Sequence, residues 1–184
     1  MTLLASRGQL RAGFLRWALV LVPGVLLLGL LSAALSRSGP GNPWFDALQK
    51  PAIYPPPEVF GIVWSVLYML MALALAQVVV ARGARLRRAA IALFLIQLVL
   101  NLAWSPLFFA AHQIAAALVL LIILDVAVAI TTVVFFRVRP AAGALFVPYL
   151  AWVAFATVLN LQFLTANPNA ATGGAGAPAV RMQL

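Results

Sequence analysis

The most regular feature of the chain is the alternation of long apolar runs with short polar segments. A helix needs about 20 predominantly apolar residues to cross the hydrocarbon core of a bilayer. Five runs meet this length, and they cover residues 17–36, 59–81, 89–111, 114–136 and 143–165. The pattern predicts an all-α fold, an integral membrane bundle of five transmembrane helices.

Composition supports a membrane protein and excludes several other classes. Of the 184 residues, 65% are hydrophobic and only 8% are charged, which would leave a soluble domain with too little polar surface. The net charge is +9, but the basic residues form short clusters between apolar runs, as topology determinants do. There is no cysteine and only one histidine, so we expect no disulfide and no metal site. We expect the chain to associate with the lipid bilayer and not to bind nucleic acid.

The distribution of basic residues predicts the orientation, because five spans place the termini on opposite faces. One face carries Arg7, Arg11, Arg16, Arg82, Arg85, Arg87, Arg88, Arg137 and Arg139. The other face carries Arg37, Lys50 and Arg181. Cytoplasmic loops are enriched in Lys and Arg. We therefore expect a multi-pass protein, in a bacterial cell membrane, with the basic segment 1–16 in the cytoplasm and the C-terminus outside.

The two ends of the chain differ from the five-span domain at 17–165. The first apolar run is longer than the roughly 7–15 residues of a signal-peptide core, so we expect a true span, with a cleaved signal peptide as the alternative. Residues 166–184 are rich in Asn, Ala, Gly and Pro without periodicity. This composition predicts a disordered C-terminal tail.

The loop 37–57 is rich in proline and aromatic residues. It contains Pro40, Pro43, Pro51, Pro55, Pro56 and Pro57 together with Trp44, Phe45 and Tyr54. Proline fixes φ and biases the preceding residue towards extended geometry, so we expect a stiff segment and a helix that begins near Val59. The loop is either a rigid aromatic flap or an interfacial anchor, since Trp and Tyr are enriched at headgroup depth. Residue types alone do not decide between these.

A polar stripe follows the third run. Gln97, Asn101 and Ser105 are spaced at i, i+4 and i+8 and share one helix face. An unsatisfied amide costs several kcal/mol in hydrocarbon, so the stripe faces either another helix or a ligand cavity. Hydrogen bonding between helices is favoured for Gln97. A cavity is favoured for Asn101, because Trp104 and Phe108 lie one and two turns further on.

Two other runs carry similar aromatic positions. The fifth run has Tyr149, Trp152, Ala156, Leu159 or Asn160, and Phe163 at three- and four-residue steps, and the second has Trp64 and Tyr68. At 1.5 Å rise per residue, Trp64, Trp104, Ala156, Asn101 and Trp152 lie about 8 to 20 Å below the outer face. Ala156 is either a notch for helix packing or the floor of a pocket. A cavity under the loop with stacking surfaces, amides and no charge would suit a large flat ligand such as a tetrapyrrole or a sterol.

Asp125 lies at the centre of the fourth run, where a carboxylate costs about 2.5 to 3.5 kcal/mol on insertion scales. The apolar runs contain no Lys, Arg or His to pair with it. We predict that this intramembrane acid is protonated at neutral pH, or hydrogen-bonded to an Asn, Gln or Thr such as Thr132. An acidic residue inside the membrane also makes proton-coupled transport of small molecules an alternative function.

Several of these residues fall in motifs that resemble the TspO/MBR family of tryptophan-rich sensory proteins and mitochondrial translocator proteins. The motifs are WFDALQKP at 44–51, PP at 55–56, VWSVLY at 63–68, NLAWSPLFF at 101–109 and PYLAWVAFATVLN at 148–160. The resemblance implies a five-helix bundle, commonly a homodimer, with a pocket beneath the first loop. The resemblance also implies that this pocket accepts porphyrins, haem, cholesterol and synthetic benzodiazepine-type ligands.

The resemblance and the residue pattern together give the expected site. The predicted ligand-binding residues are Tyr54, Trp64, Tyr68, Asn101, Trp104, Phe108, Tyr149, Trp152, Ala156 and Leu159. We expect no required cofactor and a porphyrin, haem or sterol as ligand, bound by a membrane receptor or carrier for tetrapyrrole transport, sensing or disposal. One alternative is a light- and oxygen-dependent porphyrin-degrading enzyme that uses Trp64 and Trp152. Another is a proton-coupled transporter that uses Asp125.

The chain departs from the family pattern in its first loop. Ala52 and Ile53 stand where the family usually has a Trp after the Lys-Pro pair, and Glu58 replaces a second Trp. We expect less stacking surface over the pocket and a charge at its mouth. Small-residue pairs at Gly29 with Ala33 and at Ala72 with Ala76 pack helices either within or between protomers.

Overall fold

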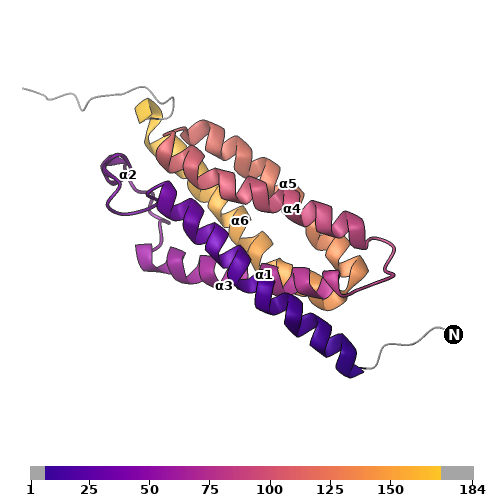
Figure 1. The fold of residues 1–184 in the computed structure, drawn as a ribbon. Helices are drawn as coiled ribbons and strands as arrows, with labels where there is room; N and C mark the ends of the chain where they lie inside the picture. The colour runs from indigo at the N-terminus through magenta and orange to yellow at the C-terminus, as the bar shows by residue number, and fades with distance from the viewer. Residues whose placement is uncertain (1–6, 171–184) are drawn as a thin grey trace, which may run out of the picture.

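The chain forms a bundle of five long helices (Figure 1). A computed structural model describes residues 7–170. The long helices are α1 (Arg7–Leu35), α3 (Pro57–Val79), α4 (Arg87–Ser105), α5 (Ile114–Val138) and α6 (Pro140–Ala166). Three shorter elements are α2 (Pro43–Ala47) in the first loop, the π-helical turn η1 (Pro106–Ala110) that continues α4, and η2 (Pro168–Ala170). Each long helix, with η1 added to α4, is long and apolar enough to cross a membrane, which confirms the prediction of five spans.

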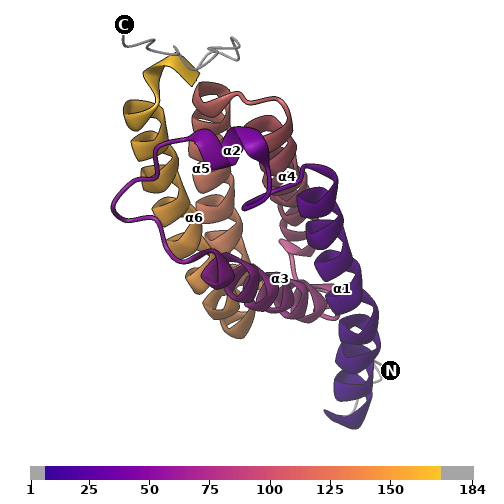
Figure 2. The same cartoon turned by 90° about the vertical axis from the view of Figure 1, so that its left-hand side faces the viewer.

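Neighbouring helices follow one another around the bundle in the order α1, α3, α6, α5, α4, with α4 returning to α1. Figure 2 shows α2 and the rest of the first loop lying across one end of the bundle, over α5 and α6. The start of α1 and the end of α6 lie at opposite ends, as an odd number of spans requires. The predicted tail at 166–184 falls mostly outside the described residues.

The helix boundaries differ from the prediction where proline begins a helix. α3 begins at Pro57 rather than at 59, α6 begins at Pro140 rather than at 143, and α2 begins at Pro43. Proline is well suited to the first helical position, because its missing N–H has no partner there and its φ is already helical. α1 begins at Arg7 rather than at 17, because arginine is a good helix former and the apolar run does not mark the helix end.

Small residues allow the helices to approach closely within one chain. Ala72 and Ala76 of α3 are completely buried. At Gly29 of α1, a Cβ atom would lie 2.2 Å from Cε2 of Tyr68 on α3. Both predicted small-residue pairs therefore include positions that pack helices within the protomer.

The end of α4 is shaped by Pro106. Because Pro106 has no N–H, the Leu102 carbonyl oxygen lacks its helical partner, and the Ser32 hydroxyl of α1 donates to it at 2.7 Å. The next turn widens to a π-helix, in which the Ala111 N–H donates to the Pro106 carbonyl oxygen at 2.8 Å. The turn ends at Ala110, and His112, two residues further on, has a φ of +58°. The wide turn buries Phe108 and Phe109 together under the first loop.

Candidate ligand-binding cavity

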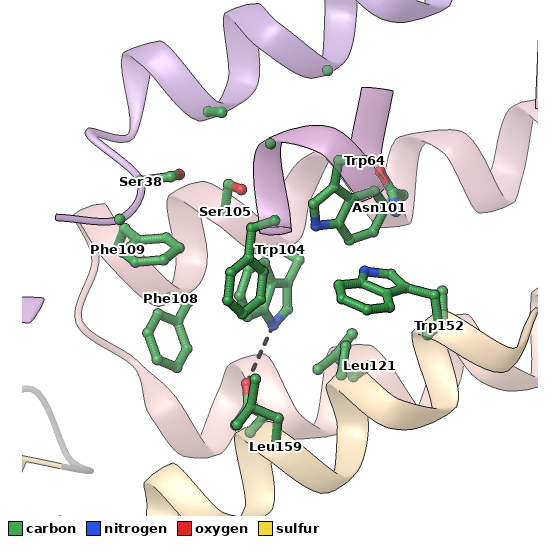
Figure 3. Close-up of a pocket in the computed structure, with 18 of the residues that line it drawn as sticks. Ser38, Trp64, Asn101, Trp104, Ser105, Phe108, Phe109, Leu121, Trp152 and Leu159 are labelled. Atoms are coloured by element: carbon green, nitrogen blue, oxygen red, sulfur yellow. Dashed lines mark hydrogen bonds between the residues drawn. The ribbon is translucent and has the colours of Figure 1, made fainter. Parts of the chain in front are cut away.

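A cavity of about 350 Å³ lies inside the bundle beneath the first loop. Its walls come from α1, α3, α4, α5 and α6, and its cover from the loop. Figure 3 shows Trp64, Trp104 and Trp152 around it, with Ser38 and Phe109 towards one end. The described residues that line it are mostly aromatic or aliphatic, and none of them carries a charge. Its size is at the lower end of the range for small-molecule sites, about 300 to 1,000 Å³.

The structure brings nine of the ten predicted residues together in this cavity. They are Tyr54, Trp64, Tyr68, Asn101, Trp104, Phe108, Trp152, Ala156 and Leu159. Tyr149 does not line the cavity, because its side chain is completely buried among the helices. Helical periodicity placed Tyr149 on the correct face of α6, but it did not show that neighbouring side chains cover it.

Tyr149 belongs to a ladder of hydrogen bonds that runs from the cavity wall into the bundle. The Tyr68 hydroxyl donates to Asn101 Oδ1 at 2.8 Å, and Asn101 Nδ2 donates to the Tyr149 hydroxyl at 3.1 Å. The Tyr149 hydroxyl in turn donates to Gln97 Oε1 at 2.9 Å. As predicted, Gln97 makes a hydrogen bond between helices, whereas Asn101 stands at the boundary of the cavity. The ladder fixes the polar wall of the site without using a charge.

The tryptophans of the cavity are held in different ways. Trp104 stacks on Phe108 with the ring centroids 5.1 Å apart, and its Nε1 donates to Asn160 Oδ1 at 3.2 Å. Trp64 stacks on Tyr68 at 5.4 Å. Trp152 contacts the rings of Phe60 at 5.9 Å and Phe155 at 5.2 Å, but its buried Nε1 has no hydrogen-bond partner among the described residues.

The first loop is fastened over the cavity at two places. Asn42 caps α2 by accepting from the Trp44 and Phe45 backbone N–H groups at 3.1 and 3.2 Å, and its Nδ2 donates to the Phe109 carbonyl oxygen at 3.2 Å. At the other side, Gln49 and the Asn167 side chain exchange two hydrogen bonds of 2.8 and 3.0 Å. Because the loop also supplies cavity-lining residues, its geometry fits an aromatic flap better than an anchor alone.

The underside of the loop combines ring contacts with one basic residue. Phe45 packs at 5.8 Å from Phe163, and Lys50 Nζ lies 4.2 Å from the Phe45 ring centroid. Lys50 also donates to the Phe45 and Leu48 carbonyl oxygens. Burial lowers the pKa of Lys50, and nearby Asp46 partly opposes this. Burial, with a smaller contribution from Asp46, raises the pKa of Tyr54, so this phenol faces the cavity as a neutral group.

The two loop positions that depart from the family pattern lie outside the cavity. Ile53 is 40% exposed and Glu58 is exposed in the first turn of α3, and neither side chain lines the cavity. A carboxylate at the beginning of a helix interacts favourably with the helix dipole. The departures therefore remove rings from the covering loop without placing a charge in the cavity lining.

Several lining residues were not predicted. Phe60 lies one turn before Trp64, so an i, i+4 extension of that aromatic stripe would have found it. Phe163, one turn after Leu159, continues the stripe noted on the fifth run but was not assigned to the site. Leu26 and Leu30 of α1 also line the cavity. They carry no such signal, because α1 is apolar around its whole circumference and its sequence does not show which face points inward.

Asp125 lies between α5 and α6 and does not line the cavity. The Thr157 hydroxyl, on α6, lies 2.7 Å from Asp125 Oδ2. The prediction of a Thr partner is confirmed, but Thr132 is wrong: its hydroxyl donates to the Val128 carbonyl oxygen at 2.7 Å. Thr132 is two turns away along the same helix, beyond the reach of the Asp125 side chain, whereas Thr157 comes from the adjacent helix.

Comparison with known proteins finds similar sequences over most of the five-helix domain. The model of the TspO/MBR family matches residues 19–165. The translocator protein of Homo sapiens is 44% identical over 124 residues, covering 66% of this chain and 73% of that protein. The tryptophan-rich sensory protein of Cereibacter sphaeroides is 40% identical over 126 residues, covering 68% and 78%. Protein CrtK of Rhodobacter capsulatus is 36% identical over 126 residues, covering 68% and 79%. The chain belongs to the TspO/MBR family and is an integral, multi-pass membrane protein of receptor type.

Proposed function

We propose that this receptor binds a planar hydrophobic ligand, a porphyrin, haem or a sterol, in the cavity beneath the first loop. The observation that carries the proposal is the cavity itself, which is enclosed by rings on α3, α4 and α6 and has no charged lining residue among those described. Stacking on indole and phenyl faces favours a flat ligand. Binding of this kind serves transport, sensing or disposal of tetrapyrroles.

The few polar groups in the cavity favour a ligand with hydrogen-bond acceptors. Ser38 Oγ and Trp152 Nε1 are both buried without a partner among the described residues, and both side chains line the cavity. In Figure 3, Ser38 and Trp152 lie on opposite sides of the cavity. A buried donor without a partner costs about 1 to 3 kcal/mol, so a ligand that accepts from either group recovers part of this free energy. Porphyrin carboxylates meet this requirement better than the single hydroxyl of a sterol.

A second candidate function is light- and oxygen-dependent porphyrin degradation. The observation that favours it is that Trp64 and Trp152 line the same cavity, where either indole would be next to a bound tetrapyrrole. Proton-coupled transport through Asp125 has no such support, because this carboxyl group contacts Thr157 outside the cavity lining.

The test is a titration of the purified protein in phosphatidylcholine nanodiscs with protoporphyrin IX, in the dark and followed by tryptophan quenching. We expect saturable binding at micromolar concentration, with cholesterol competing if both ligands use the cavity. The same sample is then illuminated in air. Loss of porphyrin in proportion to time, abolished by Trp64→Phe or Trp152→Phe without loss of binding, would assign the enzymatic function. No saturable binding by the folded protein would reject the proposal for porphyrins.

A further inference from the structure

The lipid-facing side of the bundle carries a groove between α3 and α6. It is lined by Ile62, Val63, Val66, Leu67, Leu70, Pro148, Ala151 and Trp152. Ile62 is 66% and Val66 is 44% exposed, although both belong to a membrane-spanning helix. Apart from one indole N–H, the side chains in the groove are apolar. The medium that meets this groove is therefore the hydrocarbon of the bilayer.

Trp152 separates this groove from the cavity. Among the described residues, it is the one whose side chain lines both. The adjacent residues on α6 do not reinforce the wall: Ala151 is small and exposed, and Pro148 stands one turn earlier. Because Pro148 has no N–H, it also removes one hydrogen bond from this turn of the helix. The Trp152 ring thus stands between this groove and the cavity.

Trp152 can also move without breaking a hydrogen bond. Its Nε1 has no partner, and ring contacts with Phe60 and Phe155 hold it in place. Trp104 is different, since its Nε1 is bonded to Asn160. A second route into the cavity would pass through the first loop, which is fastened by Asn42 and by the pair of hydrogen bonds between Gln49 and Asn167. Opening the loop breaks these bonds, whereas rotating Trp152 does not.

We propose that the α3–α6 groove is a lateral access route by which an apolar ligand dissolved in the bilayer reaches the cavity, with Trp152 as the gate. The occupant of the groove is the ligand itself, because the groove is continuous with the lipid-facing surface on one side and borders the cavity on the other. This inference rests on the proposed function, since it requires that the cavity binds such a ligand.

The test compares association and dissociation rates of protoporphyrin IX in phosphatidylcholine nanodiscs by stopped-flow quenching. Ala151→Leu fills the groove, and Ala154→Leu adds the same side chain at an exposed position of α6 that lines neither the groove nor the cavity. We expect Ala151→Leu to slow both rates about tenfold and to leave Kd unchanged, because it obstructs the passage and not the bound state. Ala154→Leu should behave as the wild type. Val66→Phe, on α3, provides a second obstruction if Ala151→Leu does not fold.

If the ligand entered through the loop instead, obstructing the groove would leave the rates unchanged and fixing the loop in place would block association. The chain has no cysteine, so Gln49→Cys combined with Asn167→Cys allows the loop to be cross-linked to the end of α6. We expect the cross-linked protein to bind at the wild-type rate. Wild-type rates in Ala151→Leu and Val66→Phe, or loss of association on cross-linking, would overturn the lateral route while the proposed function stands. Absence of saturable binding in the wild type would overturn both.

Discussion

At the scale of single residues, Gly29 decides where the Tyr68 ring can lie. A Cβ atom at this position would be 2.2 Å from Tyr68 Cε2, so Gly29→Ala must displace the ring from the cavity wall and disturb its hydrogen bond to Asn101. We expect ligand affinity to fall by about tenfold, in line with overpacking costs of about 1 to 3 kcal/mol. Gly24→Ala on the same helix is the matched control, because no atom lies within 4 Å of a Cβ atom added at this position. Equal affinities for the two variants in a dark porphyrin titration would contradict this account.

The hydrogen bonds around Thr157 predict that Asp125 is protonated. The single hydrogen of the Thr157 hydroxyl has two acceptors, Asp125 Oδ2 at 2.7 Å and the Val153 carbonyl oxygen at 3.1 Å. Both contacts are satisfied if Asp125 carries a proton and donates it to Thr157, which then donates to Val153. We therefore expect Asp125→Asn, which keeps a donor, to preserve stability, and Thr157→Val to lose on the order of 1 kcal/mol. Thermal unfolding in nanodiscs provides the measurement, and marked destabilisation by Asp125→Asn would show that the carboxylate is required.

At the scale of elements, Asn42 is one of the two places where the first loop is fastened to the bundle as a folded cover. Asn42 both caps α2 and donates to the Phe109 carbonyl oxygen at the end of η1. Removing a helix cap costs typically about 1 kcal/mol, so Asn42→Ala should loosen α2. We expect faster amide hydrogen exchange at Trp44 and Phe45 and no change in the middle of α5. Unchanged exchange at these two amides would mean that ring contacts and the Gln49–Asn167 hydrogen bonds hold the loop without the Asn42 cap.

The elements also show how far the sequence predicts the structure. Apolar length correctly predicted five spans, and helical spacing predicted most of the cavity, because Trp64, Trp104 and Ala156 repeat with residues one turn away. The short helix α2 was not predicted, although Asn42 followed by Pro43 is a local signal for a helix start that the sequence already contains. The sequence also did not separate Tyr149 from Trp152, because spacing gives the face of a helix and not the neighbours that cover it.

At the scale of the whole molecule, the basic clusters predict that the N-terminus is cytoplasmic and the cavity opens near the outer face. The chain has no cysteine, so single substitutions can be labelled without background. We expect a membrane-impermeant maleimide to label Gln49→Cys and not Arg85→Cys in intact cells. The reverse pattern would invert the orientation and place the covering loop in the cytoplasm.

The central claim is that the ligand lies in the cavity beneath the loop, and a pair of alanines on α6 tests it most directly. Ala156 lines the cavity, whereas Ala154 is exposed on another face of the same helix. The variants Ala156→Phe and Ala154→Phe are titrated with protoporphyrin IX in the dark. The comparison shows the effect of the same added ring inside and outside the cavity. We predict that Ala156→Phe abolishes saturable binding and that Ala154→Phe binds as the wild type does. Undiminished binding by a folded Ala156→Phe protein would place the ligand elsewhere and contradict the account.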